Sequence, residues 1–261
     1  MLRNPLYRIM FWLLLLLPLS TQARDELVFS TIAEANPYTT EALFTPLVNY
    51  LSRMTGKPIV LDVSSNVVEH AVRMRLNKFD IVFDDAHFAA WRMEKKGHVP
   101  LVRGQGDYRI AVVMDAASAL QSVEQLQSGH QRICALDSPA MSTMAFLAHF
   151  PNPTWQPFLI HARDDADALD CLRRGRGDLA VVEAATWEVM DKQGLKLLPL
   201  ADKVYPQRTI TAGPRVDPQT REALRSALLS DEGQRLSRDI LRAIGLPGTA
   251  HICLRRSVHS A

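Results

Sequence analysis

Apolar and polar positions alternate along this chain with two different periods. Residues 41–54 carry apolar side chains three or four positions apart, which predicts an amphipathic helix. Residues 81–83 and 179–182 are unbroken apolar runs, which are typical of parallel strands buried on both faces. Because such helix and strand signals alternate from Glu26 onward, the pattern predicts an α/β fold.

The same pattern predicts a full set of elements. Strands are expected at residues 27–32, 58–63, 79–84, 99–102, 132–136, 158–160, 178–182 and 195–200. Helices are expected at residues 41–54, 67–76, 87–96, 123–127, 142–149, 164–173, 184–192, 218–229 and 232–244. Two further β segments, 108–114 and 208–212, are interpreted as crossings between two halves. We therefore expect two lobes joined by two hinge strands, with 24–107 and 209–261 in lobe 1 and 108–208 in lobe 2.

One strand motif occurs twice. A basic turn leads through an aspartate into an apolar strand that ends on acid, first at residues 78–85 and again at 176–183. Ligands of open α/β sheets lie outside the carboxyl ends of such strands, which is where Asp84, Asp85 and Glu183 fall. On this motif alone, two similar lobes and two ordinary strands of one large sheet are equally good interpretations.

The start of the chain predicts export. Arg3 and Arg8 precede an apolar run at residues 9–17, and small residues stand at a cleavage site near Ala23, so residues 1–23 are expected to be a signal peptide. An uncleaved membrane anchor is the alternative. Without residues 1–23 the 30 basic residues become 28, against 28 acidic ones, so the mature chain is formally neutral and its charge does not indicate a nucleic-acid surface.

The cysteines and histidines indicate no metal site. Cys134, Cys171 and Cys253 have no metal-finger spacing, and the 8 histidines are scattered. A disulfide between Cys134 and Cys171 is compatible with an oxidising compartment, but we favour two buried free thiols.

Several segments, in order, resemble the phosphonate/phosphate-type substrate-binding proteins of ABC importers, which belong to the type II periplasmic-binding superfamily. Residues 44–56 (FTPLVNYLSRMTG) resemble a helix of that family and are followed by the expected strand at residues 58–63. The strand unit of Asp80 resembles a later strand of the family's pattern. Residues 137–143 occupy the position of the family's Ser/Thr-rich loop, and 173–182 resemble its second-lobe strand. The resemblance implies a two-lobed Venus-flytrap protein that closes on a small oxyanion-bearing solute.

The chain departs from the family at one place. Where the family has a small turn, this sequence has Asp84, Asp85, Ala86, His87 and Phe88. Two carboxylates at the mouth of a cleft would repel a phosphonate unless they are paired or protonated.

The Ser/Thr-rich loop supplies the first candidate ligand contacts. Ser138, Ser142 and Thr143 lie just before or within the first turn of an expected helix, where free backbone N–H groups and hydroxyls favour an anion. The alternative is a plain helix cap. His161 ends an expected strand on the cleft side, where it would donate to an oxyanion, or it is a surface residue.

The acidic strand ends supply the next candidates. His87 would offset the charge of Asp84 and Asp85 at a ligand, or it is simply their hydrogen-bond partner. Asp85 and Glu183 stand at matched positions, where they would hold a cationic group of the ligand or cap the following helices.

The first strand and the strand starts complete the set. Thr31 ends the first strand, and Tyr38 lies in the loop after it, where the family resemblance implies an aromatic ligand contact. For Tyr38 the alternative is packing over the next helix. Asp80 and Asp178 begin their strands on the far side from the cleft, so we expect them to have a structural role in the turn.

These observations predict a periplasmic solute-binding protein that takes a phosphonate, phosphate, phosphite or similar solute and delivers it to an ABC importer. The expected partners are a small-molecule anion or zwitterion and an ABC permease or membrane sensor, and the protein is expected to be a monomer that binds no nucleic acid. The alternative is a ligand-sensing or accessory periplasmic protein of the same fold that signals to a kinase or redox partner. We find no nucleophile–base motif, so we expect neither enzyme activity nor a cofactor.

Overall fold

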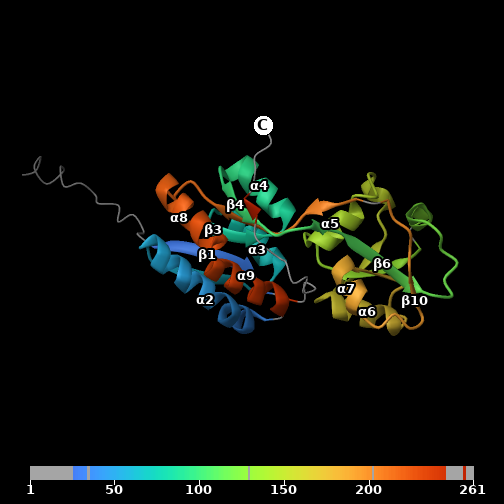
Figure 1. The fold of residues 1–261 in the computed structure, drawn as a ribbon. Helices are drawn as coiled ribbons and strands as arrows, with labels where there is room; N and C mark the ends of the chain where they lie inside the picture. Colours follow the sequence, from blue (N-terminus) through green and yellow to red (C-terminus); the bar gives the residue numbers. More distant parts are fainter. Residues whose placement is uncertain (1–25, 34–35, 129, 202, 245–254, 257–261) are drawn as a thin grey trace, which may run out of the picture.

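The computed structural model describes residues 26–33, 36–128, 130–201, 203–244 and 255–256. The predicted signal peptide and Cys253 lie outside these residues. Figure 1 shows two α/β bodies side by side, linked by extended segments of the chain. None of the helices within the described ranges is long and apolar enough to cross a membrane. The α/β fold class predicted from the sequence is confirmed.

The first body is built on a six-stranded sheet. Its strands are β1 (Leu27–Ile32), β2 (Ile59–Ser64), β3 (Ile81–Asp84), β4 (Val99–Arg103), β12 (Thr209–Ala212) and β13 (Arg255–Arg256). Its helices are α2 (Pro37–Thr55), α3 (Val67–Arg75), α4 (Ala86–Lys96), α8 (Pro218–Leu229) and α9 (Asp231–Ala243).

The second body is built on a five-stranded sheet. Its strands are β6 (Ile110–Asp115), β7 (Arg132–Leu136), β8 (Phe158–Ala162), β9 (Leu179–Glu183) and β10 (Leu195–Leu197). Its helices are α5 (Met141–Leu147), α6 (Asp165–Arg173) and α7 (Ala184–Val189), with 3₁₀ turns η1 (Val123–Ser128) and η2 (Pro153–Trp155).

The two sheets have the same topology. Their strand orders are β2-β1-β3-β12-β4-β13 and β8-β7-β9-β6-β10. In each, the first three strands are parallel and the fourth, β12 or β6, is antiparallel to its neighbours. Each of these antiparallel strands closely follows a crossing segment, β11 (Tyr205–Pro206) or β5 (Asp107–Tyr108), and the two crossing segments pair with each other. The domain boundaries predicted at 107/108 and 208/209 fall in or next to these segments, and the division into two lobes stays a prediction.

The aspartates that begin the duplicated strands each tie two neighbouring strands together, at the end of the sheet opposite the acidic strand ends. The Asp80 carboxylate accepts the Val28 N–H of the neighbouring strand at 2.9 Å and pairs with the Arg215 Nε at 2.9 Å. Asp178 repeats this contact, because it accepts the Arg132 N–H at 2.8 Å and pairs with the same arginine's side chain. The structural role predicted for both aspartates is confirmed.

Helix ends follow the local capping chemistry. Asn36 caps α2 through its side chain, which accepts from the Thr39 N–H, and Pro37 takes the first helical position, where its missing N–H costs nothing. The helix therefore begins four residues before the residue 41 that apolar spacing alone predicts. Gly56 ends it with a φ of 66°, in the left-handed region that glycine enters most readily.

The two buried cysteines are joined. Cys134 of β7 and Cys171 of α6 form a disulfide with a Cα–Cα distance of 6.1 Å, within the usual range. The prediction of two free thiols is therefore wrong. Strand and helix already pack face to face in this core, so the covalent bond ties α6 to the sheet it covers.

Candidate functional site

The predicted ligand-binding residues gather at the carboxyl ends of strands or at the starts of the helices that follow. Those in the first body are Thr31 in β1, Tyr38 in the first turn of α2, Asp84 at the end of β3, and Asp85 and His87 at the start of α4. Those in the second body are Ser138, Ser142 and Thr143 between β7 and α5, His161 in β8 and Glu183 at the end of β9. Their contacts differ widely.

Asp84 is sealed inside the first body. Its carboxylate is fully buried and bonds to the His70 Nε2 at 2.6 Å and the Arg92 Nε at 2.5 Å. Burial opposes ionisation, but the His70 hydrogen bond and the Arg92 charge outweigh it and lower the pKa of Asp84. The prediction that Asp84 contacts a solute conflicts with these contacts, because both of its oxygens are occupied. The alternative that His87 is the hydrogen-bond partner of Asp84 is wrong, because His70 takes that place.

A serine extends this buried chain. The Ser64 hydroxyl lies 3.0 Å from the His70 Nδ1, so serine, histidine and aspartate contact one another in series. Such a series is a nucleophile–base–acid arrangement in hydrolases. Here all three residues are buried, and Arg92 closes the other side of the carboxylate, so no substrate reaches the hydroxyl.

Asp85 and Glu183 converge on one arginine of the second crossing. The Arg208 Nε lies 2.9 Å from an Asp85 oxygen, and one of its terminal nitrogens lies 3.8 Å from a Glu183 oxygen. The side chains of all three residues are largely buried. Each acid stands at the N-cap position of the helix that follows, as the capping alternative has it, but its side chain makes no cap hydrogen bond there. The matched acids of the two bodies are therefore joined through Arg208.

The same group of charges surrounds Tyr108 in the first crossing. Burial, and then the nearby carboxylates of Glu183 and Asp85, raise the pKa of the Tyr108 phenol well above its ordinary value. The phenol therefore stays neutral across the physiological range.

His87 reaches from the first body to the second. Its Nε2 lies 2.9 Å from the Pro139 carbonyl oxygen, which only accepts, so this nitrogen carries the proton. The Nδ1 of the same ring is buried and has no hydrogen-bond partner among the described residues. Buried ring nitrogens without a hydrogen-bond partner are uncommon, so this nitrogen indicates a partner outside the described residues, such as a ligand atom.

The loop that His87 touches carries the hydroxyl candidates. Thr143 is fully buried and donates to the Leu136 carbonyl at 2.6 Å, which makes it a structural anchor of the loop. Ser142 lies beside it in the first turn of α5 and is 3 % exposed. Ser138 is exposed, with its hydroxyl 3.4 Å from the Met144 sulfur.

The remaining candidates lie apart from one another. The His161 Nδ1 is 2.9 Å from an Asp137 oxygen, and both side chains are exposed. Thr31 is buried within β1, whereas Tyr38 is 84 % exposed and does not pack over its helix.

Comparison with known proteins places this arrangement. The family model for the periplasmic phosphonate substrate-binding proteins of ABC transporters matches residues 29–252. This chain belongs to that family. Members bind small anionic ligands and deliver them to ABC permeases, and they are binding proteins of the periplasm, not enzymes. No curated protein matches the sequence.

Solved structures agree with this family's fold at low sequence identity. XAC2383 of Xanthomonas citri, bound to ATP, has a TM-score of 0.71 and 13 % identity over 90 % of this chain and 92 % of its own. PhnD1 of Prochlorococcus marinus, in complex with methylphosphonate, has a TM-score of 0.63 and 11 % identity over 90 % and 93 %. The binding component of an ABC phosphonate transporter from Pseudomonas aeruginosa has a TM-score of 0.64 and 13 % identity over 82 % and 78 %. The chain thus has the type II periplasmic-binding fold.

Sequence reasoning missed the cations that compensate the acids of this binding protein. Arg92 was detectable as the lone charge on the apolar face of α4, four residues after the buried Phe88. Arg208 was detectable as a second basic residue on a crossing segment, matching Arg109 on the first. Both arginines pair with the carboxylates that seemed to exclude a phosphonate, and so that objection no longer holds.

Proposed function

We propose that this binding protein closes on a small oxyanion-bearing solute, such as a phosphonate, phosphate or phosphite, and delivers it to an ABC importer. In this proposal residues 24–107 with 209–261 and residues 108–208 are two lobes that hinge at the crossing segments. The solute binds between them, and residues 1–23 direct export.

The observation that carries the proposal is the buried, unpartnered Nδ1 of His87. With the proton on Nε2, this nitrogen accepts a hydrogen bond, and the P–OH group of a hydrogen phosphate or hydrogen phosphonate is a partner that supplies one. His87, which belongs to the first body, already donates to the Pro139 carbonyl of the second body, so one ring contacts both bodies. Ser142, in the first turn of α5 and three residues after Pro139, offers a hydroxyl from the second body.

The electrostatic balance supports an anion over a cation. Asp84 is compensated by His70 and Arg92, and Asp85 and Glu183 share Arg208, so each of these three acids already has a cationic partner. A ligand amine would have to displace one of these pairs. The bound relatives that carry ATP or methylphosphonate also hold oxyanions. The comparisons give no support to the alternative, a sensing or accessory role.

Thermal unfolding of residues 24–261 tests the solute class. Phosphate, methylphosphonate and phosphite are titrated, with an arginine salt as a cationic control. A ligand at 100 times its dissociation constant stabilises the folded state by about 2.7 kcal/mol. If none of the oxyanions raises the midpoint, the oxyanion proposal is wrong.

Two variants then test the location. His87→Ala and Ser142→Ala are expected to weaken the responding oxyanion by about tenfold each, the effect of losing roughly 1.4 kcal/mol of hydrogen bonding. Thr143 is left intact because it anchors the loop. His130→Ala, which removes an exposed histidine of the second body, is the matched control. Unchanged affinity in His87→Ala would place the solute elsewhere.

A further inference from the structure

The second sheet is incomplete beside its antiparallel strand. β10 pairs with β6 only at Asp115, Met114 and Val113, and the Leu198 N–H then bonds to the Val112 carbonyl. Pro199 follows, which has no N–H to continue the ladder, and the chain leaves the edge. In the first body the equivalent strand, β12, pairs with β4 along its whole length. The fold therefore does not require this gap.

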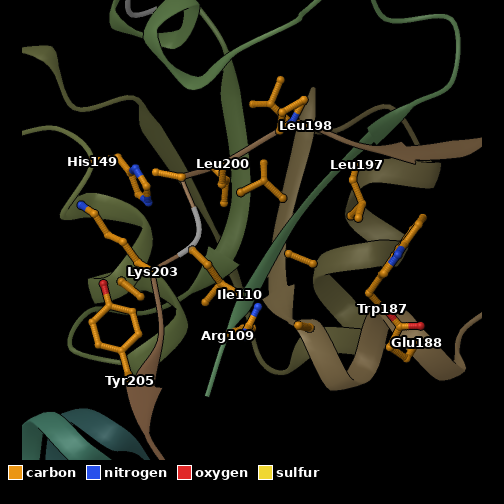
Figure 2. A pocket seen from close by; sticks show the side chains of 16 residues that line it. Arg109, Ile110, His149, Trp187, Glu188, Leu197, Leu198, Leu200, Lys203 and Tyr205 are labelled. Carbon is orange, nitrogen blue, oxygen red and sulfur yellow. The ribbon is translucent and has the colours of Figure 1, made fainter. Parts of the chain in front are cut away.

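The gap is a cavity. Its volume is ≈ 360 Å³, within the range of small-molecule pockets. The start of β6, the end of α5, α7, a strap formed by residues 197–201, and then Lys203 and Tyr205 line it. The cavity therefore lies in the second body, next to the second crossing segment, and includes none of the residues proposed to contact the solute. Figure 2 shows the lining side chains around the open space.

The cavity has a polar corner and an apolar body. The Lys203 amine and the His149 ring lie together on one side, with the Tyr205 hydroxyl turned toward them, and Trp187 lies on the opposite side (Figure 2). Leucine side chains of the strap line the region between. Partial burial, and then the charge of Lys203, lower the pKa of His149, which leaves the ring neutral and able to share one hydrogen bond.

The charges around the rim favour a monoanion. Among the described lining residues, Arg109 and Lys203 are cations, and Glu188 is the single acid. Glu188 is exposed and faces Lys192 at 3.6 Å. Within the described part of the chain, the Lys203 amine makes a long 3.5 Å hydrogen bond to the Ala148 carbonyl, which a carboxylate would readily replace.

We propose that this cavity is a second binding site, separate from the cleft, for a small carboxylate with an apolar body, such as an aromatic acid. The carboxylate lies against Lys203 and His149. The ring or branched chain occupies the space between the strap leucines and Trp187.

Titration calorimetry with benzoate and phenylacetate tests the proposal, and benzamide is the matched neutral probe. At least one acid is expected to bind with a dissociation constant below about 1 mM, and benzamide about tenfold more weakly. Lys203→Gln should weaken the acid by about tenfold or more. Ala201→Trp, which places a large side chain on the exposed rim, should abolish binding. Lys78→Gln, an exposed lysine of the first body, is the control.

Several outcomes overturn the proposal. They are the absence of saturable binding for both acids, equal affinity for benzamide and benzoate, or unchanged binding in both cavity variants. Competition by excess inorganic phosphate would place the acids in the cleft and also refute a separate site. Because Lys203 and Ala201 are exposed, circular dichroism should show both variants folded.

Discussion

Replacing Arg208 by glutamine removes the cation that joins the acids of the two bodies. Asp85 and Glu183 would then face each other, and the buried Tyr108, without compensation. Loss of one partner from a fully buried pair costs about 3–5 kcal/mol, and an exposed pair is worth about 0–1 kcal/mol. The Arg208 side chain is 17 % exposed, Asp85 14 % and Glu183 21 %, so the effect lies between these limits and nearer the buried one. We expect a loss of about 3 kcal/mol in the free energy of unfolding.

Urea unfolding at neutral pH measures this loss. The midpoint of Arg208→Gln should fall while the slope stays unchanged, because the surface exposed on unfolding is the same. Arg208→Lys should recover part of the loss, since a lysine keeps the charge but not the planar guanidinium that contacts both acids. Arg235→Gln is the control, because that arginine pairs with Glu232 on the exposed face of α9.

The same variant has a second readout in solute affinity. Uncompensated Asp85 and Glu183 would repel an oxyanion in the proposed cleft, so affinity should fall more in Arg208→Gln than in Arg208→Lys. An Arg208→Gln midpoint no lower than that of Arg235→Gln would refute the reasoning, because Arg208 would then behave as an ordinary surface charge.

Three further predictions concern stability. His98 is buried and its pKa is lowered to about 4, first by burial, so the unfolded chain takes up a proton below pH 6.5 that the folded chain refuses. Stability should fall as pH drops from about 6.5 to about 4, by up to roughly 3 kcal/mol for this group, and a His98→Asn variant should show a shallower pH dependence in urea titrations. Reduction of the Cys134–Cys171 disulfide, or Cys134→Ala with Cys171→Ala, should cost about 2–5 kcal/mol, which thermal unfolding with and without a reductant would measure; equal midpoints would contradict the bond. Asp84→Val alone should cost about 3–5 kcal/mol, because it leaves the buried Arg92 without its carboxylate. A quadruple variant that adds Ser64→Ala, His70→Ala and Arg92→Met, the residues found 98 positions later in the second body, should lose less stability than Asp84→Val.

Elements with strong local signals were predictable from the sequence. The strand β7 and the helix α8 have the predicted bounds, since α8 begins with the Asp217 cap and Pro218. Boundaries set by tertiary contacts were harder. The helix predicted at 184–192 ends at Val189, and the strand predicted at 195–200 stops at Leu197, before the proline that opens the cavity.

Site residues were predictable in position but not in role. Asp84 and Asp85 are neighbours in sequence, yet one is sealed inside the first body and the other lies at the crossing. Their fates depend on His70, Arg92 and Arg208, which come from different elements. Sequence spacing does not reveal contacts between residues far apart in the chain. The acidic strand ends therefore predicted repulsion of an anion, whereas in the folded chain arginines neutralise these acids.

Comparison of matched positions in the two bodies shows which residues the shared fold requires. Residues 98 positions after Ser64, His70, Asp84 and Arg92 are Ala162, Ala168, Val182 and Met190. In the second body these four residues belong to or pack against one apolar cluster. The same architecture therefore tolerates a hydrophobic core where the first body buries an ion pair and a serine.

Stability alone does not explain that buried polar chain, because well-packed apolar residues often serve equally well or better. Its position is informative. Asp84 ends β3 immediately before Asp85 and His87, so its bonds to α3 and α4 fix the start of the helix that carries the contact to the second body. Hydrogen bonds have preferred directions, whereas apolar contacts allow small rotations. We therefore interpret the cluster as a rigid support for His87 and for the pair of Asp85 with Arg208. It is present in the first body, whose helix α4 contacts the second body through His87.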